Sequence, residues 1–178
     1  MSVVILDRDG VINYDSDDYI RTVDEWRPIP GSIEAIAKLS QAGYKVYVAT
    51  NQSGLARQYF TLSDLQSMHE KFESLLSQAG GEVSGIYYCP HHPNDECNCR
   101  KPKTGLLEKI SQDSGESLSG TPFVGDSLSD INAATAYGCR PILVETGKGQ
   151  KTVSLLSESV EVFANLESFV ESFLSDTA

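Results

Sequence analysis

Groups able to do phosphoryl chemistry recur at four points along this 178-residue chain, close behind short apolar runs. The groups are Asp7 and Asp9 after "SVVIL", Thr50 after "YKVYVA", Lys101 after a cysteine-rich loop, and Asp126 after "TPFVG". Carboxylate oxygens are ligands that Mg²⁺ prefers. A threonine hydroxyl and a lysine ammonium can hold the oxygens of a transferring phosphoryl group. Brought together, these side chains would suit Mg²⁺-dependent phosphoryl chemistry.

The spacing of the first two carboxylates suggests two different roles. An aspartate at the end of a strand, such as Asp7, can itself be a nucleophile. Asp9 stands two residues later, on the same side of an extended chain. There it could protonate a leaving oxygen and later take a proton from water. Each motif alone is typical of ordinary turns and helix caps, so only their joint placement favours a site.

Strand and helix patterns alternate along the chain and must bring these groups together. Short β-branched apolar runs predict strands over 2–7, 44–51, 83–88, 121–126 and 140–146. Apolar spacing and capping signals predict helices over 32–43, 61–81, 104–115, 129–138, near 152–158 and over 165–174. This alternation predicts an α/β fold with a doubly wound, Rossmann-like parallel sheet. We expect a single domain over 1–178, with ligands bound beyond the carboxyl ends of the strands.

The loop after the third predicted strand carries a metal-binding pattern. The pattern is Cys89-x-His91-x5-Cys97-x-Cys99. Three thiolates and one imidazole fit a tetrahedral structural Zn²⁺ site with no open position. A disulfide is disfavoured in the cytoplasm, and three cysteines would leave one over. We therefore expect a zinc-binding loop.

The loop ends in two basic residues, which suggests what the expected zinc site does. By ordering the loop, Zn²⁺ would hold Arg100 and Lys101 over the phosphate site. His92 is the less favoured alternative to His91 as a ligand. His69, in the middle of a predicted helix, and Cys139 are expected to be structural.

Taken in order, "DRDG", "TNQSG", "RKP" and "VGDSLSD" resemble the four motifs of the haloacid dehalogenase (HAD) superfamily of phosphohydrolases. The resemblance extends from residue 3 to about residue 145 and implies a HAD-like fold. It implies that Asp7 is the nucleophile, Asp9 the general acid and base, and that Thr50 and Lys101 bind the phosphoryl group. It also implies that Mg²⁺ is held by Asp7, the carbonyl group of Asp9, and Asp126.

The role of Asp130 stays open at this level. It could orient Lys101 from behind the metal ligands. It could equally be an exposed carboxylate in the first turn of a helix, where the helix dipole favours it.

Within the superfamily, the cysteine-rich loop and "TNQSGLAR" resemble phosphatases of sugar bisphosphates, with histidinol-phosphate phosphatases as the alternative. Arg57 and Arg100 would supply cations for a second phosphate group, which favours the bisphosphate. Asn51 and Ser53 are further expected substrate contacts. A non-catalytic, zinc-organised binding protein is a remote alternative, since no catalytic position departs from the motifs.

The segment 13–27 lies where many relatives insert a cap domain, but it is too short for one. We therefore expect a nearly capless enzyme, with this segment and the zinc-binding loop as walls of an open site. Asp15, Asp18 and Tyr19 are expected to contact sugar hydroxyls, and Trp26 is expected to anchor the segment by packing.

Composition limits the partners. The formal net charge of −11 argues against a nucleic-acid surface, which would need clustered lysine and arginine. No apolar run approaches the ~20 residues of a membrane span, and no signal-peptide pattern opens the chain. We expect a cytoplasmic monomer that acts on a small phosphorylated sugar.

Overall fold

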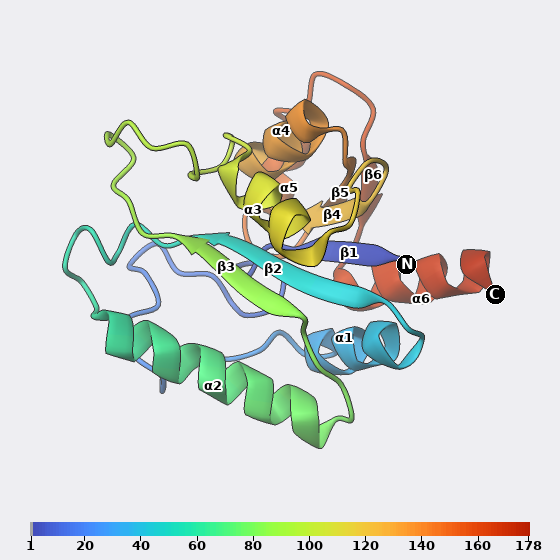
Figure 1. Ribbon diagram of the computed structural model, residues 1–178, viewed down its shortest axis with the longest axis horizontal. Coiled ribbons are helices and arrows are strands. Elements are labelled where there is room, and N and C mark those ends of the chain that lie inside the picture. Colours follow the sequence, from blue (N-terminus) through green and yellow to red (C-terminus); the bar gives the residue numbers. More distant parts are fainter. Residues whose placement is uncertain (1) are drawn as a thin grey trace.

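The computed structural model describes residues 2–178 and contains one six-stranded parallel sheet (Figure 1). The strands are β1 (Val3–Leu6), β2 (Lys45–Asn51), β3 (Gly85–Cys89), β4 (Pro122–Gly125), β5 (Arg140–Val144) and β6 (Glu161–Phe163). Their order in space is β3-β2-β1-β4-β5-β6, so the succession of strands reverses between β1 and β4. A ligand crevice is expected at such a reversal. The predicted doubly wound sheet is confirmed.

Helices cover both faces of the sheet (Figure 1). One face carries α1 (Ser32–Gln41), α2 (Leu62–Gln78) and α6 (Leu166–Thr177), and the other carries α3 (Gly105–Ser114), α4 (Leu128–Tyr137) and α5 (Gly149–Val153). Alternate residues of β1 serve the two faces, as the period of a strand requires. Val4 and Leu6 join the core beneath α1 and α2, whereas Val3 and Ile5 join the core beneath α3 and α4.

Two C-terminal elements differ from the sequence-based expectation. β6 was not predicted, because its three residues form a short edge strand that is largely exposed and has no apolar run. The helix expected near 152–158 is α5, which spans Gly149–Val153. A glycine opens this helix, and a Cβ at Gly149 would collide with the carbonyl oxygen of Val144. Glycine is unfavourable in a helix, so the sequence did not predict a helix that begins here. The close contact with β5 leaves no room for a larger residue at this position.

The loop over residues 10–30 folds onto the sheet. Its three isoleucines and Val11 are buried, and Trp26 is fully buried against Phe72 of α2, with ring centroids 5.7 Å apart. The packing role predicted for Trp26 is confirmed. Within this loop the described chain forms isolated bridges and turns but no helix or ladder of strands. This agrees with the expected lack of a cap domain, and a single domain over 1–178 stays our interpretation.

None of the helices among residues 2–178 combines the length and apolar character needed to span a bilayer.

Candidate active site

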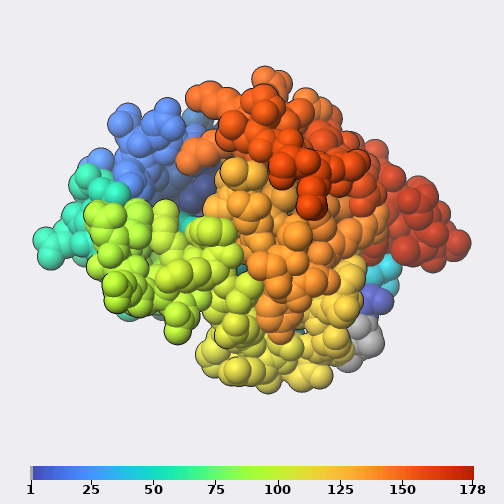
Figure 2. All heavy atoms as spheres, turned by 90° about the horizontal axis from the view of Figure 1, so that it is seen from above, coloured from blue at the N-terminus to red at the C-terminus, as the bar shows by residue number. Residues whose placement is uncertain are grey.

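The carboxyl ends of β1, β2 and β4 open into one cleft, which also receives the end of the cysteine-rich loop. Figure 2 shows a hollow bounded by the loop over 10–30 (blue), the cysteine-rich loop (yellow-green) and the segment after β4 (orange). The cleft has a volume of about 280 Å³. Its walls include Asp7, Asp9, Thr50, Lys101 and Asp126, so all five residues singled out for phosphoryl chemistry meet there.

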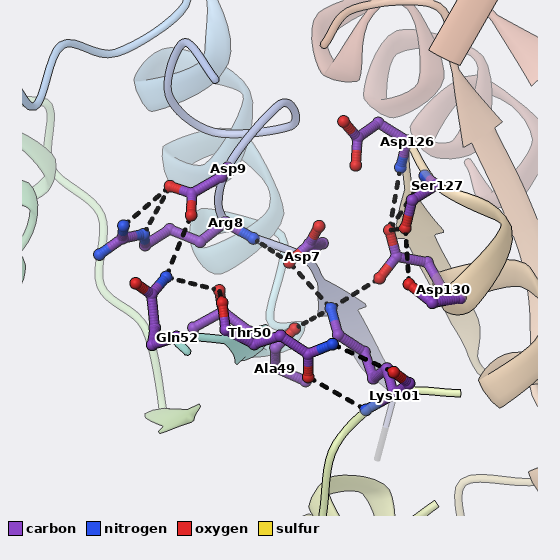
Figure 3. Close-up of polar contacts among 12 residues, drawn as sticks. Asp7, Arg8, Asp9, Ala49, Thr50, Gln52, Lys101, Asp126, Ser127 and Asp130 are labelled. Carbon is purple, nitrogen blue, oxygen red and sulfur yellow. Dashed lines mark hydrogen bonds and ion pairs between the residues drawn. The ribbon is translucent and has the colours of Figure 1, made fainter. Parts of the chain in front are cut away.

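Lys101 is buried at the centre of the cleft, 94 residues along the chain from Asp7 (Figure 3). Its Nζ donates hydrogen bonds to Asp7 Oδ1 at 2.9 Å, to Asp130 Oδ1 at 2.6 Å and to the carbonyl oxygen of Ala49 at 2.8 Å. Asp130 is only 1% exposed, so it is not a solvated first-turn carboxylate. The structure thus favours the orienting position for Asp130.

Residues of the β2 end fix the other side of the cleft. The Asn51 side chain exchanges two hydrogen bonds with the backbone of Lys101, through Nδ2 at 3.1 Å and Oδ1 at 3.0 Å. Asn51 therefore ties the cysteine-rich loop to the sheet. The hydroxyl of Thr50 accepts a hydrogen bond from Gln52 Nε2 at 3.0 Å, and the same amide nitrogen donates to Asp9 Oδ2 at 3.0 Å.

The side chain of Asp9 is held by three hydrogen bonds and one ion pair. Its Oδ1 accepts hydrogen bonds from Arg8 Nε at 2.9 Å and Asn13 Nδ2 at 2.8 Å, and Arg8 Nη2 forms an ion pair with it at 2.8 Å. Its Oδ2 accepts from Gln52. Burial alone would raise the pKa of Asp9, but the guanidinium of Arg8 and these hydrogen bonds hold the pKa below its ordinary value.

The remaining acidic groups of the cleft repel one another. Burial, and next the charge of Asp130, raise the pKa of Asp7 well above its ordinary value, with Lys101 opposing the shift. Burial and Asp130 likewise raise the pKa of Asp126 to about 7. Burial opposes the charge of Lys101, yet Asp130 and Asp7 raise the pKa of its ammonium group. The cleft thus gathers more negative charge than Lys101 balances, which is the condition that a divalent cation relieves.

The donor set fits Mg²⁺. Carboxylate oxygens of Asp7, Asp126 and Asp130 lie within 4.8 Å of one another. Both oxygens of Asp130 are already engaged, because Oδ1 accepts from Lys101 while Oδ2 accepts from Ser127. Asp7 Oδ2 and Asp126 Oδ1 accept no hydrogen bond from the described residues. Two hard oxygens are therefore free for a cation. The side chain of Asp9 lies outside this group, so a contribution from Asp9 would come from its carbonyl oxygen.

Glycines keep the space beside Asp126 open. A Cβ at Gly10 would lie 2.0 Å from Asp126 Oδ2, and one at Gly147 would lie 2.3 Å from the same atom. Both glycines also have positive φ angles, of 86° and 57°. A side chain at either position would push Asp126 out of place.

The cysteine-rich loop gathers the four predicted zinc ligands. The Sγ atom of Cys89 lies 3.8 Å from that of Cys97 and 3.0 Å from that of Cys99, and His91 Nδ1 lies 3.1 Å from Cys99 Sγ. A tetrahedral zinc site has ligand–ligand separations of roughly 3.3–3.8 Å, so the cluster is close to that geometry. All four cysteines of the chain are free thiols.

The other histidines and Cys139 lie outside the cluster. His92 Nδ1 accepts a hydrogen bond from the backbone N–H of Asn94, which favours His91 as the ligand. His69 packs beneath Arg8, and Cys139 is buried in the core, as expected.

The expected substrate contacts divide into two sets. Asp15, Tyr19, Asn51, Ser53 and Arg100 all line the cleft. Asp18 and Arg57 are not among the lining residues.

Both of the residues outside the cleft have neighbours that explain their positions. The Asp18 side chain is exposed, and its carbonyl oxygen accepts a hydrogen bond from Arg21 Nε. The guanidinium of Arg57 lies 5.9 Å from the ring centroid of Tyr19, so Arg57 contacts a residue that lines the cleft without lining the cleft itself.

Several cleft residues escaped the sequence analysis. No role was predicted for Gln52, although its side chain donates hydrogen bonds to both Thr50 and Asp9. Lys148 follows β5, and its backbone N–H donates to Asp126 Oδ2 at 2.9 Å. Its position after the fifth predicted strand was the signal that could have found it. Arg8 carried no such signal, because a charged residue between two aspartates looks solvated, yet it is 1% exposed.

A doubly wound sheet that gathers an acidic pair, a hydroxyl, a buried lysine and a further aspartate at its strand ends defines a HAD-like hydrolase. The family model described as HAD-hydrolase-like matches residues 98–168. The chain is 56% identical over 174 residues to D-glycero-β-D-manno-heptose-1,7-bisphosphate 7-phosphatase of Pseudomonas aeruginosa, covering 97% of this chain and 98% of that protein. It is 51% identical to the enzyme of the same name from Neisseria meningitidis serogroup A, covering 100% and 97%.

A solved structure agrees with these relatives. The crystal structure of D,D-heptose 1,7-bisphosphate phosphatase from Bordetella bronchiseptica, complexed with magnesium and phosphate, superposes with a TM-score of 0.97. It is 46% identical in sequence, and the match covers 99% of both chains. The chain therefore belongs to the heptose-1,7-bisphosphate 7-phosphatase family of HAD-like hydrolases. The predicted superfamily is confirmed.

Proposed function

We propose that this protein is a Mg²⁺-dependent phosphatase that removes the 7-phosphate of D-glycero-β-D-manno-heptose 1,7-bisphosphate and leaves heptose 1-phosphate. The observation that carries the proposal is the contact between Lys101 and Asp7 inside a cleft that also holds Thr50, Asp9 and Asp126. The names of the relatives supply the sugar and its anomer. By the same resemblance, the reaction belongs to the synthesis of nucleotide-activated heptose for lipopolysaccharide.

In the proposed reaction Asp7 is the nucleophile. A carboxylate oxygen of Asp7 attacks phosphorus, the bond to the sugar oxygen breaks, and a proton from Asp9 goes to that oxygen. Asp9 then takes a proton from a water molecule, whose oxygen attacks the phosphoryl group on Asp7 and releases inorganic phosphate. Lys101 and Thr50 hold the oxygens of the phosphoryl group throughout.

Metals support this chemistry in two places. Bound Mg²⁺ would offset the charges of Asp7 and the phosphate, and Asp7, Asp126 and the Asp9 carbonyl group would hold it. Structural Zn²⁺ at the cysteine-rich loop would keep Lys101 and Arg100 in position. The short distances within the Cys/His cluster support the zinc assignment.

Arg100 is the residue best placed to bind the second phosphate group of the substrate. Its side chain lines the cleft, and its Nη1 atom is buried without a hydrogen-bond partner among the described residues. An unsatisfied buried donor on a cation is well suited to a substrate anion. Asn51, Ser53, Asp15 and Tyr19 would complete the walls around the sugar.

Two further proposals concern the cellular location and the oligomeric state. We propose a cytoplasmic enzyme, which four free thiols support, because thiols stay reduced there. We propose that it acts as a monomer, because Asp7, Asp9, Thr50, Lys101 and Asp126 together supply every group of the proposed reaction, so the site needs no residue from a second copy.

The proposal is tested by phosphate release from heptose 1,7-bisphosphate and from histidinol phosphate, side by side, with Mg²⁺ and with EDTA. We expect a strong preference for the bisphosphate, loss of activity in EDTA, and no activity in Asp7→Asn. A preference for histidinol phosphate would keep the nucleophile and the zinc site but overturn the assigned substrate.

A further inference from the structure

A buried cation lies directly behind the carboxylate of Asp9. Arg8 stands between the two aspartates of the first motif, and its side chain is 1% exposed. Burying a guanidinium is costly unless charged and hydrogen-bonding partners compensate for the lost water. Arg8 therefore has a role that requires its charge at this position.

One side of the Arg8 guanidinium contacts Asp9, the proposed general acid and base (Figure 3). Its Nε and Nη2 both reach Oδ1 of Asp9, at 2.9 and 2.8 Å. Asn13 Nδ2 reaches the same oxygen at 2.8 Å. Oδ1 thus accepts two hydrogen bonds and also forms an ion pair with Nη2, which makes no hydrogen bond itself. These contacts occupy Oδ1 and disfavour a proton on it.

The second oxygen of Asp9 is much less restrained. Oδ2 accepts a single hydrogen bond from the described residues, from Gln52 Nε2 at 3.0 Å. That amide nitrogen also donates to the hydroxyl of Thr50, on the side of the cleft where the phosphoryl group is expected. The Asp9 side chain is 25% exposed, so the cleft can reach it.

Helix α2 supports the far end of Arg8. Arg8 Nη1 lies 3.2 Å from His69 Nε2 and 3.8 Å from Met68 Sδ. Since arginine can only donate, His69 Nε2 must be the acceptor and its proton must sit on Nδ1. Burial, with the charge of Arg8, lowers the pKa of His69 to about 4, which keeps the ring neutral as this contact needs.

We propose that Arg8, held by His69, is a positioning residue that occupies Oδ1 of Asp9 and thereby reserves Oδ2 for proton transfer. The low pKa of Asp9 belongs to the free cleft, and the negative charge of a bound phosphate group would raise it. In the first step Oδ2–H gives its proton to the sugar oxygen as the bond between phosphorus and that oxygen breaks. In the second step Oδ2 takes a proton from the attacking water. The inference rests on the proposed function, because it assigns an atom and a supporting pair to the same reaction.

The test compares leaving groups that do and do not need a proton. A sugar alkoxide is a poor leaving group and needs protonation, whereas p-nitrophenolate leaves readily without it. In Arg8→Met we expect the first turnover of the sugar phosphate to slow by about 10–100-fold, within the range that general acid catalysis supplies. We expect the first release of nitrophenolate to stay within about threefold of the wild type, followed by slow later turnovers, since Asp9 must still activate water. Asp9→Asn is the reference for loss of proton transfer.

Equal slowing of the first turnover with both substrates would overturn the inference, because a merely loosened site would treat them alike. Arg8→Lys keeps the charge but lacks the planar set of donors of a guanidinium. We therefore expect its relative slowing with the two substrates to lie between those of the wild type and Arg8→Met. Far-UV circular dichroism and the midpoint of thermal unfolding confirm that each variant is folded.

If Arg8→Met does not fold, the pair His69→Gln and His69→Leu carries the test. Glutamine keeps an acceptor for Arg8 and is expected to resemble the wild type, whereas leucine is expected to slow only the first turnover of the sugar phosphate. Identical behaviour of the two variants would refute the support from His69. A wild-type protein that hydrolyses p-nitrophenyl phosphate but not heptose 1,7-bisphosphate overturns the substrate alone, whereas one that hydrolyses neither overturns both proposals.

Discussion

At the scale of single residues, the site is built from charges that constrain one another. Lys101 is shared between Asp7 and Asp130, at 2.9 and 2.6 Å. Asp130 thus keeps Lys101 within reach of Asp7, while Ser127, the N-cap of α4, holds Asp130 in turn through hydrogen bonds from its N–H and its hydroxyl to Oδ2. Removing one partner of a buried pair leaves an uncompensated charge. Each such residue therefore affects both stability and chemistry.

His69 allows one consequence of burial to be measured. Its pKa is lowered to about 4 by burial and by Arg8, against an ordinary value of about 6.5 in the unfolded chain. Between these values the unfolded state binds a proton that the folded state does not, so stability falls as pH drops from 6.5 toward 4. Relative to His69→Gln, the wild type should lose roughly 2–3 kcal/mol of unfolding free energy between pH 7 and pH 4.5.

The measurement is urea unfolding of both proteins at each pH, without divalent ions. The difference between wild type and variant isolates His69 from the carboxylates of the cleft. Parallel curves for the two proteins would contradict a buried neutral imidazole.

At the scale of elements, the cysteine-rich loop between β3 and α3 is half-buried or exposed throughout residues 90–100. It is held through the Cys/His cluster and through the two hydrogen bonds of Asn51 to Lys101. Its last residue, Lys101, is nevertheless among the most buried charged residues. A loop that must place a buried lysine accurately needs a local support, and the proposed zinc ion would provide one.

Cys97→Ser should remove that support. A serine hydroxyl is a poor zinc ligand, so we expect the zinc content to fall well below one per chain. Displacement of Lys101 by about 1 Å should lower kcat/KM by about 10–100-fold. Cys139→Ser is the matched control, because Cys139 lies outside the cluster and should leave the zinc content unchanged. Full zinc content and full activity in Cys97→Ser would argue against a structural zinc site.

At the scale of the whole molecule, the reversal of strand order between β1 and β4 creates the site. It places Asp7 beside Asp126, although 118 residues separate them in the sequence, and Lys101 arrives from the third strand. The folded chain therefore concentrates buried carboxylates that it would keep apart when unfolded. A divalent cation that binds only the folded state should stabilise it.

We expect Mg²⁺ at about 100 times its dissociation constant to add ~2.7 kcal/mol and to raise Tm by roughly 5–10 °C. Asp126→Asn should gain much less from Mg²⁺. Without the ion it should be at least as stable as the wild type, because it removes a carboxylate whose pKa is raised to about 7 by burial and by the charge of Asp130. Thermal unfolding with and without Mg²⁺ measures both effects, and equal Mg²⁺ shifts in the two proteins would exclude Asp126 as a ligand.

The sequence by itself determined which groups stand at the strand ends. Short apolar runs predicted five of the six strands. The polar groups that follow four of these strands are the residues that meet in the cleft. This was possible because parallel strands place their carboxyl ends on one edge whatever their order. The clustering of Cys89, His91, Cys97 and Cys99 was likewise predictable, because these residues are close in the sequence.

Only the tertiary structure decided which side chains turn into the cleft and which support it from behind. Asp130 is buried and hydrogen-bonded to Lys101. The guanidinium of Arg57 lies over the ring of Tyr19, and that of Arg8 is hydrogen-bonded to Asp9. These outcomes depend on contacts between segments distant in the chain, such as the approach of α2 to the end of β1. A local pattern specifies the element and its polar end, whereas long-range packing sets the direction and burial of each side chain.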